Sequence, residues 1–152
     1  MSEFATGRPV VLRAWHNTST RAVKYGAGGA FFADAPTAEY GDEAIEVVLR
    51  FRRPLVVGGD KVDAAAAVGA DVAEVERIVV DEIPTSSNPR RLYAKVDALI
   101  AVAARRAGHD GIIYTNPMSL SRHEYVALRQ GGWRVVRHGG VAVAARSRFG
   151  AR

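Results

Sequence analysis

The chain has 152 residues, with 21 lysines and arginines against 16 aspartates and glutamates, a formal net charge of +5, and this length suits one domain better than two. It contains no cysteine, which excludes disulfide frameworks, thiolate metal sites and thiol catalysis. No apolar run approaches the roughly 18 residues that cross a bilayer, and the N-terminus lacks a secretory pattern, so we expect a cytoplasmic protein, or one delivered into a target cell by other machinery.

The first part of the chain is typical of strands. The alternating segment "PVVLRAWHN" predicts a strand from about Val10 to His16. A second short strand, "AFFAD", precedes Pro36, which suits the first turn of a helix that carries Thr37 and Tyr40. The segment "AIEVVLRFRRPLVV" predicts a long strand that is broken or bent at Pro54, because proline removes a hydrogen-bond donor.

The middle of the chain is helical in pattern, and strands follow it. An alanine-rich stretch from Lys61 to about Asp81 predicts helix interrupted at Gly69. A longer helix is capped near Asn88, has a proline in its first turn, and ends at Gly108. The segments "DGIIYTN", "EYVALR", "WRVVRH" and "VAVAAR" predict late strands. This order predicts a single α+β domain over residues 1–146, followed by a loose tail at 147–152.

Several common site chemistries do not fit the sequence. In "GAGGAFFADAPTAEY" the glycines come before a strand, whereas a dinucleotide loop needs glycines between a strand and a helix. The phosphate-binding P-loop pattern is absent, the four histidines lack paired metal spacing, and no serine lies in a nucleophile elbow. Basic residues are spread along the chain, so the charge fits either a solvated surface or phosphate contacts.

Three segments in order resemble the His-Tyr-Glu branch of the ADP-ribosyltransferase fold, which includes poly(ADP-ribose) polymerases and diphtheria toxin. "AWHNTS" is similar to its "WHG[ST]" segment, "GAGGAFFADAPTAEY" to "GxGxYFAxxxxxSxxY", and "SRHEYVAL" to "NEYVVY". "EVVLRFRRPLVV" and "GHDGIIYTN" resemble segments of small bacterial and phage members. The resemblance implies a split β-sandwich of two small antiparallel sheets with flanking helices and an NAD cleft between them.

The same resemblance implies which residues would bind the nicotinamide half of NAD. The glycine-rich loop would pass close to it, Tyr40 would stack on the nicotinamide ring, and Phe31 would lie on the opposite side. The hydroxyl of Thr37 and the backbone of Asn17 would hold the carboxamide. Asn17 stands where relatives carry glycine, which is a departure from the family pattern.

The catalytic set implied by the resemblance is Glu124, His16 and Tyr40. His16 would bind the adenosine ribose with help from Thr18, and Glu124 would stabilise the oxocarbenium-like transition state at the other ribose. NAD would be the co-substrate, and no metal is needed. Ser121 and Arg122 would lie in the acceptor-recognition loop. Arg122 occupies the place of a second glutamate in arginine-modifying relatives, so arginine is disfavoured as acceptor.

These features predict a toxin-like mono-ADP-ribosyltransferase that modifies a macromolecular acceptor, either protein or nucleic acid, and has no membrane partner. An inhibitor protein is a further expected partner, because toxins of this fold often travel with one. Three alternatives stay open: an NAD glycohydrolase, a catalytically degenerate member that binds protein or nucleic acid, and an unrelated basic nucleic-acid-binding domain.

Overall fold

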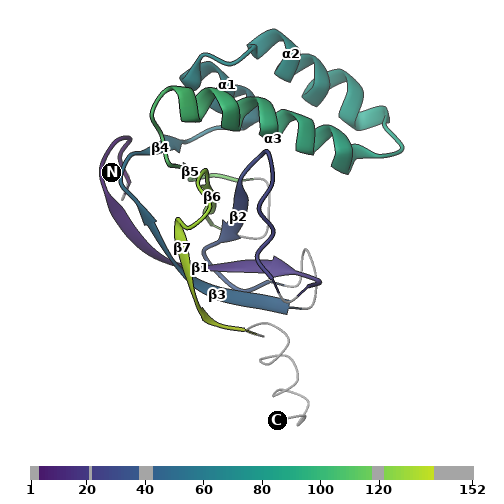
Figure 1. Cartoon of the computed structure of the whole chain (residues 1–152). Coiled ribbons are helices and arrows are strands. Elements are labelled where there is room, and N and C mark those ends of the chain that lie inside the picture. Colours follow the sequence, from purple (N-terminus) through teal and green to yellow (C-terminus); the bar gives the residue numbers. More distant parts are fainter. Residues whose placement is uncertain (1–3, 21, 38–42, 118–121, 139–152) are drawn as a thin grey trace.

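The computed structural model describes residues 4–20, 22–37, 43–117 and 122–138, and these form an α+β fold (Figure 1). The strands are β1 (Val10–Thr18), β2 (Ala30–Ala33), β3 (Glu43–Phe51), β4 (Pro54–Val57), β5 (Gly111–Tyr114), β6 (Glu124–Ala127) and β7 (Trp133–Arg137). The helices are α1 (Lys61–Val68), α2 (Val72–Arg77) and α3 (Pro89–Arg106), with a π-helical turn at Ile78–Glu82 and a 3-10 turn at Ile83–Thr85. The α+β class predicted from the sequence is confirmed.

The described strands form one seven-stranded sheet in the order β4-β5-β6-β2-β1-β3-β7. β1 pairs with β3 along nine residues, but its ladder to β2 holds a single registered pair, Trp15 with Ala33. The sheet therefore consists of two halves joined at one point, rather than the two separate antiparallel sheets that were expected. β4 and β5 are parallel, and the helical segment between them is long enough for the crossover connection that parallel pairing requires.

The helix boundaries follow the capping residues in the sequence. The Asp60 side chain caps α1 and forms a capping box with Asp63, and Gly69 ends the helix with φ of 72°. Asn88 caps α3 and Pro89 occupies its first turn, as predicted. On α3, Val96, Ile100, Ala101 and Ala104 are buried, whereas Leu92 and Leu99 are only partly buried.

Alternating residues of β5 and β6 face two hydrophobic clusters on opposite sides of the sheet. Ile112, Tyr114 and Val126 pack with the helices, while Ile113 and Tyr125 pack with β1 and β3. Figure 1 shows all three α-helices gathered at one end of the molecule, above β4, β5 and β6. The second half of the sheet, β1-β3-β7, extends away from them and carries its own core.

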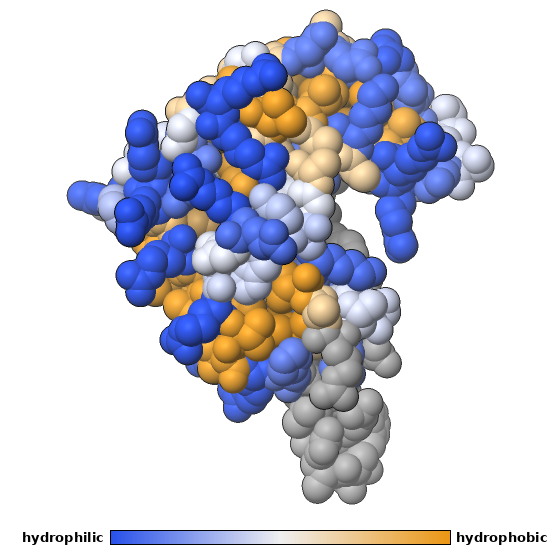
Figure 2. Space-filling model, viewed as in Figure 1, coloured by the Kyte–Doolittle hydropathy of each residue, from blue (hydrophilic) through white to orange (hydrophobic). Residues whose placement is uncertain are grey.

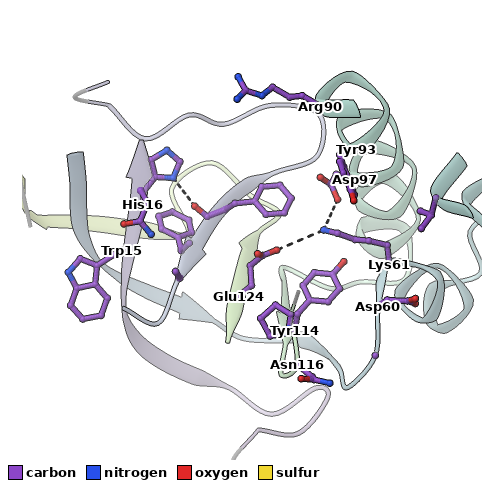
Figure 3. A pocket seen from close by; sticks show the side chains of 17 residues that line it. Trp15, His16, Asp60, Lys61, Arg90, Tyr93, Asp97, Tyr114, Asn116 and Glu124 are labelled. Atoms are coloured by element: carbon purple, nitrogen blue, oxygen red, sulfur yellow. Dashed lines mark hydrogen bonds and ion pairs between the residues drawn. The ribbon is translucent and has the colours of Figure 1, made fainter. Parts of the chain in front are cut away.

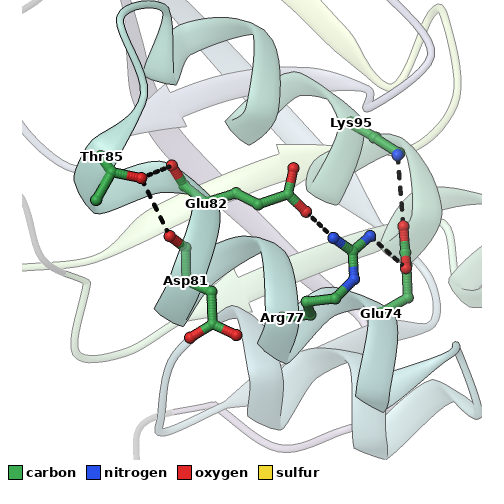
Figure 4. Close-up of polar contacts among 6 residues, drawn as sticks. All are labelled: Glu74, Arg77, Asp81, Glu82, Thr85 and Lys95. Carbon is green, nitrogen blue, oxygen red and sulfur yellow. Dashed lines mark hydrogen bonds and ion pairs between the residues drawn. The ribbon is translucent and has the colours of Figure 1, made fainter.

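Charged side chains link α2, the π-helical turn and α3 (Figure 4). Arg77 pairs with Glu74 and with Glu82, and Lys95 of α3 lies 3.4 Å from Glu74. The Thr85 hydroxyl donates to the carbonyl oxygen of Asp81 at 3.3 Å. These contacts connect α2 and the π-helical turn to α3.

Pro36 and Thr37, which were expected in the first turn of a helix, are not helical. The rest of that helix with Tyr40, the strand "VAVAAR" and the tail at 147–152 lie outside the described residues. Within the described part of the chain, no helix is both long and apolar enough to span a membrane.

Figure 2 shows hydrophilic side chains around the helices, hydrophobic ones exposed lower down, and a surface hollowed between these two parts.

Candidate functional site

A cleft of about 640 Å³ opens between the helices and the strands β1, β2 and β6. This volume is within the range of small-molecule sites, and apolar walls with a few convergent polar groups are typical of them. Its described lining residues are Trp15, His16, Asn17, Phe31, Phe32, Ala33, Gly59, Asp60, Lys61, Val79, Arg90, Tyr93, Asp97, Tyr114, Asn116, Pro117 and Glu124. Figure 3 shows that these side chains come from both the strands and the helices.

Glu124 is the first residue of β6, and its position is fixed on both sides. It pairs with Ala33 of β2 and with Tyr114 of β5. Its side chain is 18% exposed and points into the cleft toward Lys61 (Figure 3). The carboxylate is thus held at the centre of the cleft but stays reachable from solvent.

Lys61, the first residue of α1, brings an ammonium group to the same place. Its Nζ lies 2.8 Å from Asp97 Oδ1 and 3.9 Å from Glu124 Oε1. It also lies over two aromatic rings, 5.0 Å from the centre of Phe31 and 4.6 Å from that of Tyr114. One cation therefore links α1, α3, β2, β5 and β6 at the floor of the cleft.

The surroundings of Lys61 and Tyr114 shift both pKa values upward. Burial opposes the charged ammonium of Lys61, but Tyr114, Asp97 and Glu124 together outweigh it and raise its pKa above the usual range. Burial raises the pKa of Tyr114 to about 12, partly offset by Lys61 and reinforced by Asp97 and Glu124. At neutral pH the cleft therefore holds a charged lysine beside a neutral phenol.

His16 is buried at the side of the cleft, and both of its ring nitrogens have backbone partners. Nδ1 lies 2.7 Å from the carbonyl oxygen of Phe31, and the backbone N–H of Lys24 donates to Nε2 at 3.2 Å. An Nε2 that accepts requires the proton on Nδ1, so the ring is neutral. Burial lowers its pKa, the Phe31 carbonyl opposes this, and the charge of Lys24 adds to it. A ribose hydroxyl that donates a hydrogen bond to Nε2 would take the place of the Lys24 N–H as its donor.

The other residues assigned to NAD fall into two groups. Asn17 lines the cleft, and its side-chain oxygen accepts from the backbone N–H of Thr37 at 3.0 Å. No described non-glycine residue has positive φ, so Asn17 occupies the usual glycine place without backbone strain. The Thr18 hydroxyl accepts from Thr20 N–H at 3.2 Å. Neither Thr18 nor Thr37 is among the described lining residues.

The glycine-rich run does not line the cleft in the described structure, which corrects the expected nicotinamide contact. A Cβ on Gly28 would lie 2.8 Å from Asp97 Cβ, and a Cβ on Gly29 would lie 2.5 Å from the carbonyl oxygen of Ala127. Gly29 also has φ of 91°. The bare backbone is therefore needed for packing against α3 and β6, while Phe31 and Phe32 after it reach the cleft.

Three further candidates from the sequence are not brought to the cleft by the described residues. Tyr40 and Ser121 lie outside the described part of the chain. Arg122 is exposed, its backbone N–H donates to Asp34 Oδ1 at 3.1 Å, and it is not among the described lining residues. Of the predicted set, the structure gathers His16, Asn17, Phe31 and Glu124.

Sequence reasoning missed the residues that the helices contribute: Lys61, Asp97, Tyr93 and Arg90. Asp97 carried a usable signal, because it is a carboxylate beside the buried stripe of α3, one residue after Val96. Lys61 carried none, since a lysine in a first helical turn is ordinary. The described residues include no cluster of three potential metal ligands.

Comparisons with known proteins give limited similarity. No family model matches the chain. A protein from Methylibium petroleiphilum, named tetraacyldisaccharide 4'-kinase, is 32% identical over 111 residues, and this match spans 73% of the chain but 28% of that protein. A crystal structure of an anti-CRISPR protein aligns with 86% of this chain and 96% of its own, at 17% identity and a TM-score of 0.48.

Proposed function

We propose that the cleft binds NAD and that the protein is a mono-ADP-ribosyltransferase, with the ADP-ribosyltransferase resemblance of its sequence supplying the reaction class. The observation that carries this proposal is the meeting of His16 and Glu124 in one cleft. They lie on β1 and β6, far apart in sequence, and Phe31 lies on β2 between those strands. Strand register places Glu124 opposite Ala33, two residues along β2 from Phe31, and this observation does not depend on the resemblance.

The described residues fit the nicotinamide–ribose half of NAD. Phe31 offers a flat apolar ring, Asn17 offers backbone polar groups in a strand that ends at the cleft, and Glu124 offers a carboxylate near the centre. Lys61 forms an ion pair with the Glu124 carboxylate at 3.9 Å. NAD can supply the chemistry unaided by metal, because its positively charged nicotinamide is a good leaving group.

The reaction breaks the bond between the nicotinamide nitrogen and the ribose carbon, and the bonding electron pair leaves with nicotinamide. Positive charge develops on the ribose, and a carboxylate close to it stabilises that charge. A nucleophilic oxygen or nitrogen of the acceptor then bonds to the same carbon and loses its proton to solvent. If water takes the place of the acceptor, the products are free ADP-ribose and nicotinamide.

Phosphoryl transfer, the activity in the name of the curated relative, is less well supported by this site. A phosphate-cradling loop places its glycines between a strand and the N-terminus of a helix. Here the run from Gly26 to Gly29 leads into β2 and packs on α3 and β6. We therefore prefer cleavage of NAD.

Product analysis tests this proposal. The protein is incubated with NAD that carries a radiolabel in its adenylate half, with and without cell lysate. Label bound to protein or nucleic acid, with equal release of nicotinamide, is the expected result. Free ADP-ribose at the same rate without lysate would identify a glycohydrolase instead. Unchanged NAD in every reaction, together with no binding heat in a calorimetric titration, would contradict the proposal.

A further inference from the structure

The outer face of the β1-β3-β7 half of the sheet carries a set of arginines that the cleft does not use. Alternate residues of β1 and β3 turn Leu12, Ala14, Ile45, Val47 and Leu49 into the core. The residues between them face the other way. On that side lie Arg13 of β1, Arg50 of β3, and Arg134 and Arg137 of β7, here called the arginine face.

Strand register places these arginines next to one another. Val48 of β3 lies between Arg13 of β1 and Arg134 of β7 in the register. Arg50, two residues along β3 from Val48, is opposite Val11 of β1. Three adjacent strands cover about 10 Å across, and four residues along a strand cover about 13 Å. The four guanidinium groups therefore gather in an area that a few nucleotides can cover.

A buried carboxylate holds two of these guanidinium groups in place. Glu46 is 5% exposed and pairs with Arg13 and with Arg137, whose side chains are 61% and 66% exposed. Arg137 Nη2 lies 2.8 Å from Glu46 Oε1. Glu46 is the one carboxylate among the described residues of this face, so positive charge prevails and its arginines are oriented before any partner arrives. Its own pKa is lowered, first by the hydrogen bonds from Arg13 and Arg137.

Trp15 connects the arginine face to the cleft. It is opposite Glu46 in the register, and the guanidinium of Arg13 lies 5.4 Å from the centre of its ring. It also lines the cleft, and Figure 3 shows its ring turned away from Glu124. A partly exposed aromatic ring beside a row of arginines is the combination on which bases of a single strand stack.

We propose that the arginine face and Trp15 bind single-stranded nucleic acid and lead it to the cleft. Binding of the strand follows from this face alone, whereas its role as the acceptor of ADP-ribose rests on the proposed function. Arginine side chains bind phosphate through paired N–H groups whose spacing matches the phosphate oxygens. Arg50 and Arg134 are both exposed. An acidic protein would satisfy the charges but would not use the Trp15 ring in this way.

The test uses a fluorescein-labelled single-stranded oligonucleotide and the full chain, with anisotropy measured across a salt series. The informative variant is Arg50→Ala with Arg134→Ala, because neither residue belongs to the cleft. The matched control is Arg91→Ala with Arg106→Ala, which removes the same charge from exposed positions on α3. Nicotinamide release from NAD is measured on the same proteins.

We expect the first double variant to bind at least tenfold more weakly at low salt and to reduce the salt slope by about 1.4, the value for two lost phosphate contacts on a single strand. Trp15→Ala should weaken binding on the order of tenfold and leave the slope unchanged. The control should bind as wild type does, and nicotinamide release without acceptor should be equal in both double variants.

Three results would overturn the inference: equal losses in the two double variants, competition by polyglutamate as effective as that by the unlabelled oligonucleotide, or tighter binding of a duplex of the same length. Because binding is measured without NAD, failure of the proposed enzymatic activity leaves this test intact. Conversely, if the protein cleaves NAD but binds no oligonucleotide, only the inference that the arginine face binds nucleic acid is contradicted.

Discussion

Lys61 and Asp97 form an ion pair, 2.8 Å between Nζ and Oδ1, that joins the first turn of α1 to the middle of α3 inside the cleft. Their side chains are 21% and 16% exposed. The pair is thus largely shielded from water, and Glu124 is its third member at 3.9 Å. Residues that build the candidate site also hold its walls together.

Replacement of Lys61 by methionine should destabilise the fold. It leaves Asp97 and Glu124 partly buried without their cation, so we expect the free energy of unfolding to fall by about 3 kcal/mol. Urea denaturation measures this. Lys95→Met is the control, because Lys95 is 55% exposed and its pair with Glu74 is on the surface, which is worth less than about 1 kcal/mol. Equal losses in the two variants would contradict a structural role for the cleft cation.

Gly29→Ala should be far more costly than Gly26→Ala, although both lie in one glycine-rich run. Gly29 has φ of 91°, and an added Cβ would lie 2.5 Å from the carbonyl oxygen of Ala127. Around Gly26 nothing lies within 4 Å of such a Cβ. We expect losses of about 2–4 kcal/mol and below about 1 kcal/mol respectively. Thermal unfolding of the two variants provides the comparison, and similar midpoints would show that the run does not pack against β6 as described.

Acid should weaken the fold partly through His16. Burial lowers its pKa in the folded state, so below the ordinary value of about 6.5 the unfolded chain binds more protons at this residue. Stability is therefore complete above that value and falls as the pH drops toward the folded pKa. Urea midpoints at pH 7.5 and 5.5 measure the loss, which should be smaller in His16→Asn. An imidazole that titrates at or above pH 6.5 by NMR would contradict the burial argument.

Local signals in the sequence predicted most of the elements. Examples are the alternation of β1, the proline after β3, and the cap formed by Asn88 and Pro89. Each acts over a few residues, so the strand or helix boundary that it sets can be predicted from the sequence. The parallel pairing of β4 with β5 is a long-range feature, decided by how the helices pack on one face. The same reason explains why the join at Trp15 and Ala33 could not be predicted.

The candidate site was predictable only in part. His16, Phe31 and Glu124 were identified through a resemblance between short motifs, and strand pairing brings them together. Lys61 and Asp97 lie on helices whose sequence shows only the pattern of a helix that packs on a sheet. Their side chains reach the cleft because of tertiary packing, which the sequence does not reveal. The glycine-rich run shows the opposite case, because a motif typical of ligand contact serves here for close packing.

The most direct test of the central claim is the rate of nicotinamide release from NAD by wild type, Glu124→Gln and Glu76→Gln. Glu76 is exposed on α2 and is a matched control for the loss of one carboxylate. We predict turnover by wild type and by Glu76→Gln, with a loss of at least about a hundredfold in Glu124→Gln while circular dichroism shows an unchanged fold. Release by Glu124→Gln at the wild-type rate, or no release by a folded wild type, would contradict the assignment of the cleft as an NAD-cleaving site.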